Sequence, residues 1–206
     1  MAKEPYKIAA SEVIDEITIN RSRFICYLAP CQSREQAKAF IDKIQALHPQ
    51  ATHHCYAFLT GSADDSQGYG FSDDGEPTGT AGRPMLSVLQ GGGIGEICAV
   101  VVRYFGGTKL GTGGLQRAYG ASVRQALTFL ESKVKIPMVY KSLACQYNQV
   151  NDIYHVLDQM GAKIIDQVFA EQVCLQVAIP EERCEQLQQQ LFTLSAGSIV
   201  LQKTDD

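Results

Sequence analysis

Residues 97–115 read ICAVVVRYFGGTKLGTGGL, and this stretch decides the fold of the first part of the chain. The apolar run Ile97–Phe105, interrupted only by Arg103, is typical of a strand that is buried on both faces. The glycine-rich segment Gly106–Gly114 predicts a loop, and apolar residues then recur at helical spacing from Leu115 onward. The stretch therefore predicts a buried strand, a glycine loop and a helix in direct succession.

This loop and the helix after it form a candidate anion-binding site. Residues 97–130 contain four cations and no acidic residue. Glycines allow a ligand to approach the backbone closely, and a helix start offers unpaired N–H groups. The known nucleotide-binding loops do not match: Lys109 lies between the glycines, and Gln116 stands where a dinucleotide motif needs glycine. The alternative is a tight turn with solvated cations. The predicted phosphate-binding residues are Arg103, Gly106, Gly107, Lys109, Gly111, Gly113, Gly114, Arg117 and Arg124.

A second glycine-rich loop covers residues 73–83, DDGEPTGTAGR. Its clustered oxygens could hold a divalent cation, but the ligand spacing of an EF-hand is absent, so no metal site is predicted. A structural role is favoured, in which carboxylates of this loop neutralise nearby arginines. The residues expected to act in this way are Asp73, Asp74 and Glu76, with Arg83, Arg103 or Arg117 as their partners.

The strand predicted at residues 53–60 carries the candidates for catalysis. His53 and Cys55 point to the same side of a strand, and a thiol beside an imidazole can serve as nucleophile and base. Neighbours two apart on one strand rarely reach hydrogen-bonding geometry, however. We therefore expect Cys55 to be a buried structural residue, and no catalytic residue is predicted.

The rest of the first domain shows regular patterns. A β-rich stretch is interrupted by the turn residues Asn20–Ser22, and Ser33 can cap a helix because Gln36 follows three residues later. The predicted elements are a hairpin at 12–29, a helix from 34 to about 47, a short strand near 69–71 and a helix at 84–90.

The segment Lys133–Pro137 predicts a linker between two domains, 1–133 and 138–206. Residues 1–136 contain 14 Lys and Arg against 13 Asp and Glu, a net charge of +1, whereas residues 137–206 contain 4 against 9, a net charge of −5. The second domain shows strands and helices in the order β-α-β-β-α-β, which is the ferredoxin-like arrangement. These elements are predicted at 139–147, 150–160, 163–169, 173–179, 180–194 and 198–202.

The composition limits the classes of protein. The 206 residues are 45% hydrophobic, and no apolar run is long enough for a membrane span. The start lacks the pattern of a secretory signal, so a cytoplasmic protein with no membrane partner is expected. Seven cysteines without a Cys-x-x-Cys pair favour neither a disulfide framework nor a zinc site, and no cofactor is predicted. We expect Cys98, Cys145 and Cys174 to be core residues.

The segments Ser72–Pro84 and Val101–Leu115 resemble the signature of the IMPACT family, and Arg117–Tyr119 and Ala51–Ala57 extend the similarity. The acidic C-terminal domain resembles the one that bacterial members carry. The resemblance implies an α+β protein. Its first domain would fold like the second domain of small-subunit ribosomal protein five, with a left-handed βαβ crossover, and like domain IV of elongation factor G. Its second domain would resemble domain V of that factor.

The resemblance also implies a function. Eukaryotic relatives act in translational control by competing for a partner of a stress-response kinase, partly through a domain of another type. The expected function is a non-enzymatic RNA- or ribosome-associated regulator of translation, with Tyr104 or Tyr119 as candidates for stacking on bases. One alternative is a hydrolase- or peptidase-like enzyme that uses His53, Cys55 and the carboxylates of the 73–76 segment. The other is a protein-binding module whose acidic ferredoxin-like domain docks a basic partner. A protein partner in translational control is a further expectation.

Overall fold

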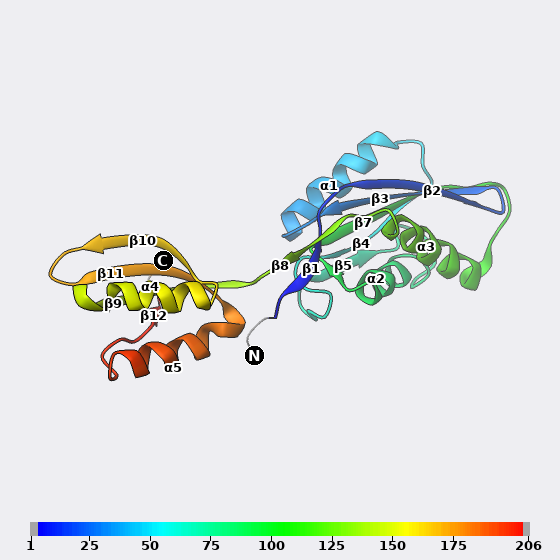
Figure 1. The fold of residues 1–206 in the computed structure, drawn as a ribbon. Helices are drawn as coiled ribbons and strands as arrows, with labels where there is room; N and C mark the ends of the chain where they lie inside the picture. Colours follow the sequence, from blue (N-terminus) through cyan, green and yellow to red (C-terminus); the bar gives the residue numbers. More distant parts are fainter. Residues whose placement is uncertain (1–3, 204–206) are drawn as a thin grey trace. The chain divides into compact units, whose positions relative to one another are not determined.

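The computed structural model describes residues 4–203 and has a mixed α+β architecture (Figure 1). The chain divides into two compact units, one covering Tyr6–Lys135 and the other beginning at Ile136. The first unit extends beyond the predicted end at residue 133, because strand β8 (Ser132–Lys135) pairs with β1 (Tyr6–Ala9). Most of the segment that was predicted as a linker is therefore a strand of the first unit.

A five-stranded antiparallel sheet forms the centre of the first unit. The central strand is β7 (Ile97–Tyr104), and it is buried along its whole length until Tyr104, as its apolar sequence, interrupted only by Arg103, predicted. In spatial order the strands are β2 (Val13–Ile19), β3 (Ser22–Pro30), β7 (Ile97–Tyr104), β4 (His53–Leu59) and β5 (Tyr69–Ser72).

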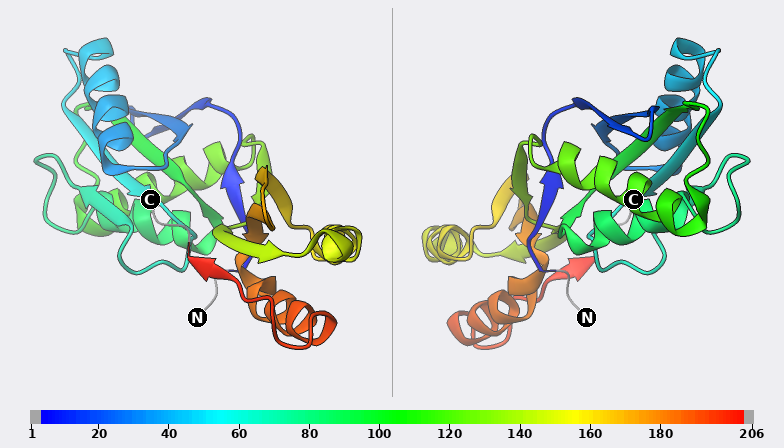
Figure 2. Two further views of the ribbon diagram at one scale, coloured as in Figure 1. Left: turned by 90° about the vertical axis from the view of Figure 1, so that its left-hand side faces the viewer. Right: turned by 90° about the vertical axis from the view of Figure 1, so that its right-hand side faces the viewer.

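Helices cover both faces of this sheet (Figures 1 and 2). Helix α1 (Arg34–Leu47) packs on one face, where Val100 and Val102 of β7 belong to its core cluster. Helices α2 (Gly82–Gly91) and α3 (Gly111–Leu127) pack on the other face, where alternate residues of β7 lie. Coverage of both faces is the physical reason why β7 shows no polar alternation.

Local sequence signals set two of the connections. The β2–β3 hairpin turns at Asn20 and Arg21, whose φ angles of 46° and 65° match the left-handed conformations of a two-residue hairpin turn. Ser33 caps α1, because its hydroxyl accepts a hydrogen bond from the Gln36 N–H at 3.3 Å. Both features were predicted from the sequence.

A three-stranded sheet in the order β6-β1-β8 was not predicted. Its third strand, β6 (Ile94–Gly95), has only two residues. Buried Glu96 follows this strand and accepts hydrogen bonds from the Tyr6 hydroxyl at 2.8 Å and from the Lys135 ammonium group. Burial and the Glu96 carboxylate raise the pKa of Tyr6. Glu96 thus links the first and last strands of the unit to its body.

The second unit contains the predicted β-α-β-β-α-β order, with the strands arranged β10-β11-β9-β12. The last strand differs from the prediction of 198–202: Ile199 is buried, but only Gln202 and Lys203 pair with β9. Cys174 is exposed and is not a core residue, in contrast to Cys98 and Cys145. The elements are β9 (Met138–Cys145), α4 (Val150–Gln159), β10 (Lys163–Phe169), β11 (Val173–Pro180), α5 (Cys184–Leu194) and β12.

Candidate functional site

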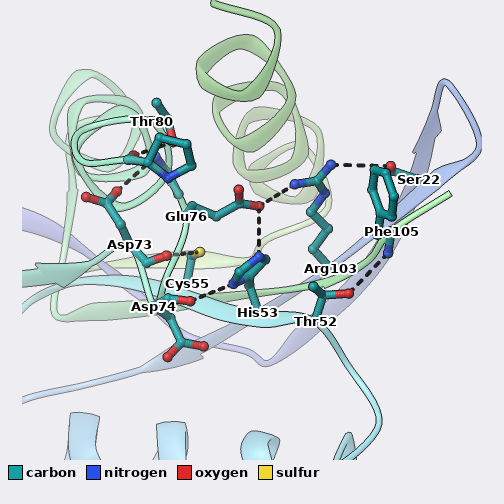
Figure 3. A network of polar contacts seen from close by, with 12 residues as sticks. Ser22, Thr52, His53, Cys55, Asp73, Asp74, Glu76, Thr80, Arg103 and Phe105 are labelled. Carbon is teal, nitrogen blue, oxygen red and sulfur yellow. Dashed lines mark hydrogen bonds and ion pairs between the residues drawn. The ribbon is translucent and has the colours of Figure 1, made fainter. Parts of the chain in front are cut away.

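The glycine-rich loop at 73–83 places the side chain of Glu76 in the interior, where it is 4% exposed (Figure 3). Its Oε1 atom lies 2.6 Å from Nη1 of Arg103 on β7, and it accepts a hydrogen bond of 2.8 Å from the Tyr119 hydroxyl on α3. Charge-assisted hydrogen bonds of this kind are among the strongest in proteins. One carboxylate therefore connects the loop at 73–83 to the central strand and to α3.

Arg103 is an interior residue rather than part of an exposed cationic surface. Its side chain is 7% exposed, and its guanidinium lies 5.5 Å from the ring centres of both Phe24 and Phe105. Its Nη2 atom is 3.5 Å from the Ser22 hydroxyl. Arg103 was predicted to bind phosphate or, as the structural alternative, to pair with a carboxylate of the 73–83 loop; the structure shows the pairing, with Glu76. A buried arginine requires such a counter-ion, because an unpaired interior charge is very costly.

Asp73 shapes the second loop through its carboxylate. The backbone N–H groups of Gly79, Ala81 and Gly82 donate to it at 2.8, 3.0 and 2.8 Å. Burial by itself would raise the pKa of Asp73, but the three donors outweigh it and lower the pKa. These bonds fix the turn that leads into α2. Among residues 4–203, no group of three or more His, Cys, Asp and Glu side chains is arranged to hold a metal ion.

Asp74 connects the same loop to β4. Its backbone carbonyl lies 2.6 Å from Nδ1 of His53, and its carboxylate accepts the backbone N–H of His54 at 2.6 Å. Arg83 was expected as a partner of these carboxylates. Its side chain is exposed instead, and it makes no ion pair among the described residues.

His53 and Cys55 do not form a nucleophile–base pair. The Cys55 thiol is fully buried and donates to the Asp73 carbonyl at 2.9 Å, and its burial raises the pKa of the thiol. His53 contacts the Asp74 carbonyl and lies 3.9 Å from Glu76 instead. Since only an accessible thiolate is reactive, this arrangement holds the loop and does not activate sulfur.

The start of α3 is the cationic part of the site. The helix begins at Gly111, so the later glycines of the predicted loop lie in its first turn. That turn contains no acidic residue, and no side chain caps it. Lys109 and Arg117 are exposed, and neither forms an ion pair or a side-chain hydrogen bond within residues 4–203. The Arg117 guanidinium approaches within 3.5 Å of the position that a Cβ on Gly113 would occupy, so it lies over this first turn.

Arg124 belongs to a different part of the surface. It lies in the last turn of α3, two turns and about 10 Å along the axis from Arg117. There it borders a cleft of about 520 Å³ between α2 and α3. The apolar lining of this cleft includes Val88, Ile94 and Leu127. The structure therefore places Lys109 and Arg117 at the start of α3 and Arg124 near its end.

The sequence interpretation missed two exposed residues beside the loop. The first is Phe105, which is 48% exposed. The two tyrosines that were predicted to stack on bases are not free to do so, because Tyr119 is fully buried and the Tyr104 hydroxyl lies 2.9 Å from Nδ1 of His48 in a hydrogen bond. Arg21 in the hairpin turn lies against the loop, since a Cβ on Gly106 would be 2.0 Å from its backbone carbon. The sequence interpretation placed Phe105 in the buried strand, but β7 ends at Tyr104 and the ring of Phe105 is exposed.

Comparisons with known proteins agree with these motifs. Residues 20–127 match the family model described as the Impact N-terminal domain, and residues 143–198 match a domain of unknown function, DUF1949. The chain is 48% identical to the IMPACT family member YigZ of Escherichia coli K12, covering 96% of this chain and 97% of that protein. It is 46% identical to an IMPACT family member of Haemophilus influenzae, with 96% of both covered.

More distant relatives and a solved structure extend this similarity. YvyE of Bacillus subtilis, named as an IMPACT family member, is 37% identical over 88% of this chain and 83% of its own length. A solved structure titled as the crystal structure of a hypothetical protein has a TM-score of 0.70 and 45% identity, and 99% of each chain is covered. Among residues 4–203, no helix has the length and hydrophobicity needed to cross a membrane. The chain belongs to the IMPACT family.

Proposed function

We propose that this protein binds the phosphate backbone of RNA at the start of α3 and acts as a non-enzymatic RNA- or ribosome-associated protein in translational regulation. The observation that carries the proposal is the exposed, unpartnered pair Lys109 and Arg117 at a helix start without an acidic residue. Helix N-termini favour anions, because their free N–H groups and dipole both attract negative charge.

The neighbouring loops support the proposal because they are anchored before any ligand binds. Glu76 and Asp73 hold the second loop against β7, α2 and α3. Gly107 and Gly111 have φ angles of 85° and 71°, and a Cβ on either would meet no atom within 4 Å. Their backbone therefore faces open space where a phosphate group can approach. Little ordering would be needed on binding, which limits its entropic cost.

The resemblance to translation proteins adds a fold-level analogy. We propose that the first unit corresponds to the second domain of small-subunit ribosomal protein five and to domain IV of elongation factor G. The second unit would correspond to domain V of that factor and to the ferredoxin-like fold. Because translation factors and a ribosomal protein share these folds, the resemblance supports RNA binding by analogy. The hydrolase alternative has less support, because Cys55 is buried and bonded to the backbone.

Salt-dependent RNA binding tests this proposal. About three cations at the site, Arg21, Lys109 and Arg117, should give a log–log salt slope of about −2 for single-stranded RNA, at about 0.7 per phosphate contact. The variant Lys109→Gln/Arg117→Gln should reduce the magnitude of the slope by about 1.5. It should unfold at the same temperature as the parent protein, since exposed cations contribute little to folding.

A control variant, Lys43→Gln/Arg124→Gln, removes the same charge from exposed positions outside the site. It should lower affinity only slightly. Equal losses in the two variants would indicate nonspecific attraction by net charge. Unchanged RNA affinity in a folded Lys109→Gln/Arg117→Gln protein would reject the proposed site.

A further inference from the structure

Phe105 is an exposed aromatic ring held in a fixed position at the mouth of the glycine loop. It directly follows the buried strand β7 and keeps 48% of its surface exposed. Its backbone N–H donates to the Thr52 hydroxyl at 3.3 Å, and the Arg103 guanidinium lies 5.5 Å from its ring centre (Figure 3). Arg103 is itself held in place by its ion pair with Glu76. The ring is therefore supported from the protein side, and its exposed surface faces solvent.

The surroundings of this ring are cationic and open. Arg21 packs its backbone against Gly106, the next residue after Phe105, and its side chain is exposed. Gly107 follows with open space where a side chain would project, and exposed Lys109 completes the loop. An exposed ring at the start of a loop that carries exposed cations offers a ligand both a stacking surface and charge neutralisation.

We propose that Phe105 stacks on an unpaired nucleobase, so that the site takes single-stranded RNA in preference to duplex RNA. This inference rests on the proposed function, because Lys109 and Arg117 supply the phosphate contacts that bring the base to the ring. Aromatic side chains next to a cationic groove bind single strands in this way, since every base has a π-face and a duplex hides it.

A purely structural role for Phe105 makes a different prediction. The ring covers Arg103, and it could serve only to keep water from the ion pair with Glu76. Leucine at this position keeps an apolar cover but offers no ring to a base. A structural role therefore predicts that Phe105→Leu leaves both stability and RNA affinity nearly unaltered, whereas stacking predicts that the stable variant binds RNA more weakly.

The absence of tryptophan from the chain allows a direct test. In Phe105→Trp the introduced indole is the sole tryptophan, and its fluorescence reports what contacts it. Oligoadenylate should quench this fluorescence. Duplex RNA of equal length and inorganic polyphosphate, which offer phosphates without accessible bases, should bind with little quenching. Unchanged fluorescence on saturation with oligoadenylate would overturn the proposal.

Affinity measurements complete the test. Phe105→Leu should bind oligoadenylate at least about fivefold more weakly, the lower end of the effect of removing one base–aromatic stack, while its affinity for polyphosphate stays unchanged. If Lys109→Gln/Arg117→Gln weakens binding and Phe105→Leu does not, the stacking inference fails and the phosphate site stands. If neither variant affects binding, both proposals fail. Thermal unfolding of each variant confirms that losses do not come from misfolding.

Discussion

Replacing Glu76 by glutamine tests whether the buried ion pair holds the glycine-rich loop at 73–83 against β7. Glutamine keeps the shape of the side chain and can still accept the Tyr119 hydrogen bond, so the change removes little but the charge. Arg103, at 7% side-chain exposure, would then lack its counter-ion. Removal of one partner of a buried ion pair costs about 3–5 kcal/mol. We expect a cost near the lower end, about 3 kcal/mol, because the glutamine side chain keeps an oxygen that can accept a hydrogen bond.

An exposed pair within the same unit gives the matched control. Arg23 and Glu16 form a bidentate pair at 2.8 and 2.9 Å, but their side chains are 52% and 40% exposed. Glu16→Gln should therefore cost about 1 kcal/mol or less. The contrast between the two variants measures the effect of burial, since both remove one carboxylate charge from a bonded arginine.

Hydrogen exchange of backbone amides measures both variants in the full chain. Peptides from β7 report global opening of the first unit, and a loss of about 3 kcal/mol should accelerate their exchange by about 150-fold. Peptides from β11 in the second unit serve as an internal reference and should be unchanged. The double variant Glu76→Gln/Arg103→Met should recover much of the loss, because no buried charge remains. Similar exchange rates in Glu76→Gln and Glu16→Gln would refute the reasoning.

Two further predictions concern the same loop. The folded state lowers the pKa of Asp73, so its contribution to stability is present above the unfolded value of about 3.9 and is lost as the pH falls through the folded pKa. Asp73→Asn should therefore destabilise the protein at pH 7 and flatten the decline in melting temperature below about pH 4; an unaltered acid profile would contradict this. In the native protein, iodoacetamide should modify exposed Cys174 and leave buried Cys55 intact, as checked by peptide mass spectrometry. Rapid modification of Cys55 would revive the enzyme alternative.

The large helices and strands could be predicted from the sequence because the conformation that their residues favour locally is also the one that the packing of the fold requires. β7 lacks polar alternation and is covered on both faces, and Asn20 in the hairpin turn takes a left-handed conformation that asparagine tolerates. The sheet β6-β1-β8 could not be predicted, because its strands are short and are defined by pairing across distant parts of the chain. Glu96, which stabilises that sheet, has partners near both ends of the unit.

The segments that form the candidate site could be predicted from the sequence. Which of its cations are buried in ion pairs and which are exposed could not. A strand covered on both faces cannot leave Arg103 solvated, and this argument was available from the apolar run around it. The sequence could not show which of Asp73, Asp74 and Glu76 is the counter-ion, because loop conformation decides it. Arg21 was not predicted to lie beside the site, because its contact with Gly106 depends on the register between β3 and β7.

This division of roles changes how mutations in the site must be interpreted. Removal of Arg103 would weaken the proposed RNA binding even without any phosphate contact, because Glu76 would lose its partner and the loop at 73–83 would lose its anchor. Removal of Lys109 affects only a solvated charge. Loss of binding alone therefore cannot assign a cation to the interface. A residue belongs to the interface only if its removal lowers the salt slope while hydrogen exchange in β7 stays unchanged, a criterion that Lys109 and Arg117 should meet and Arg103 should not.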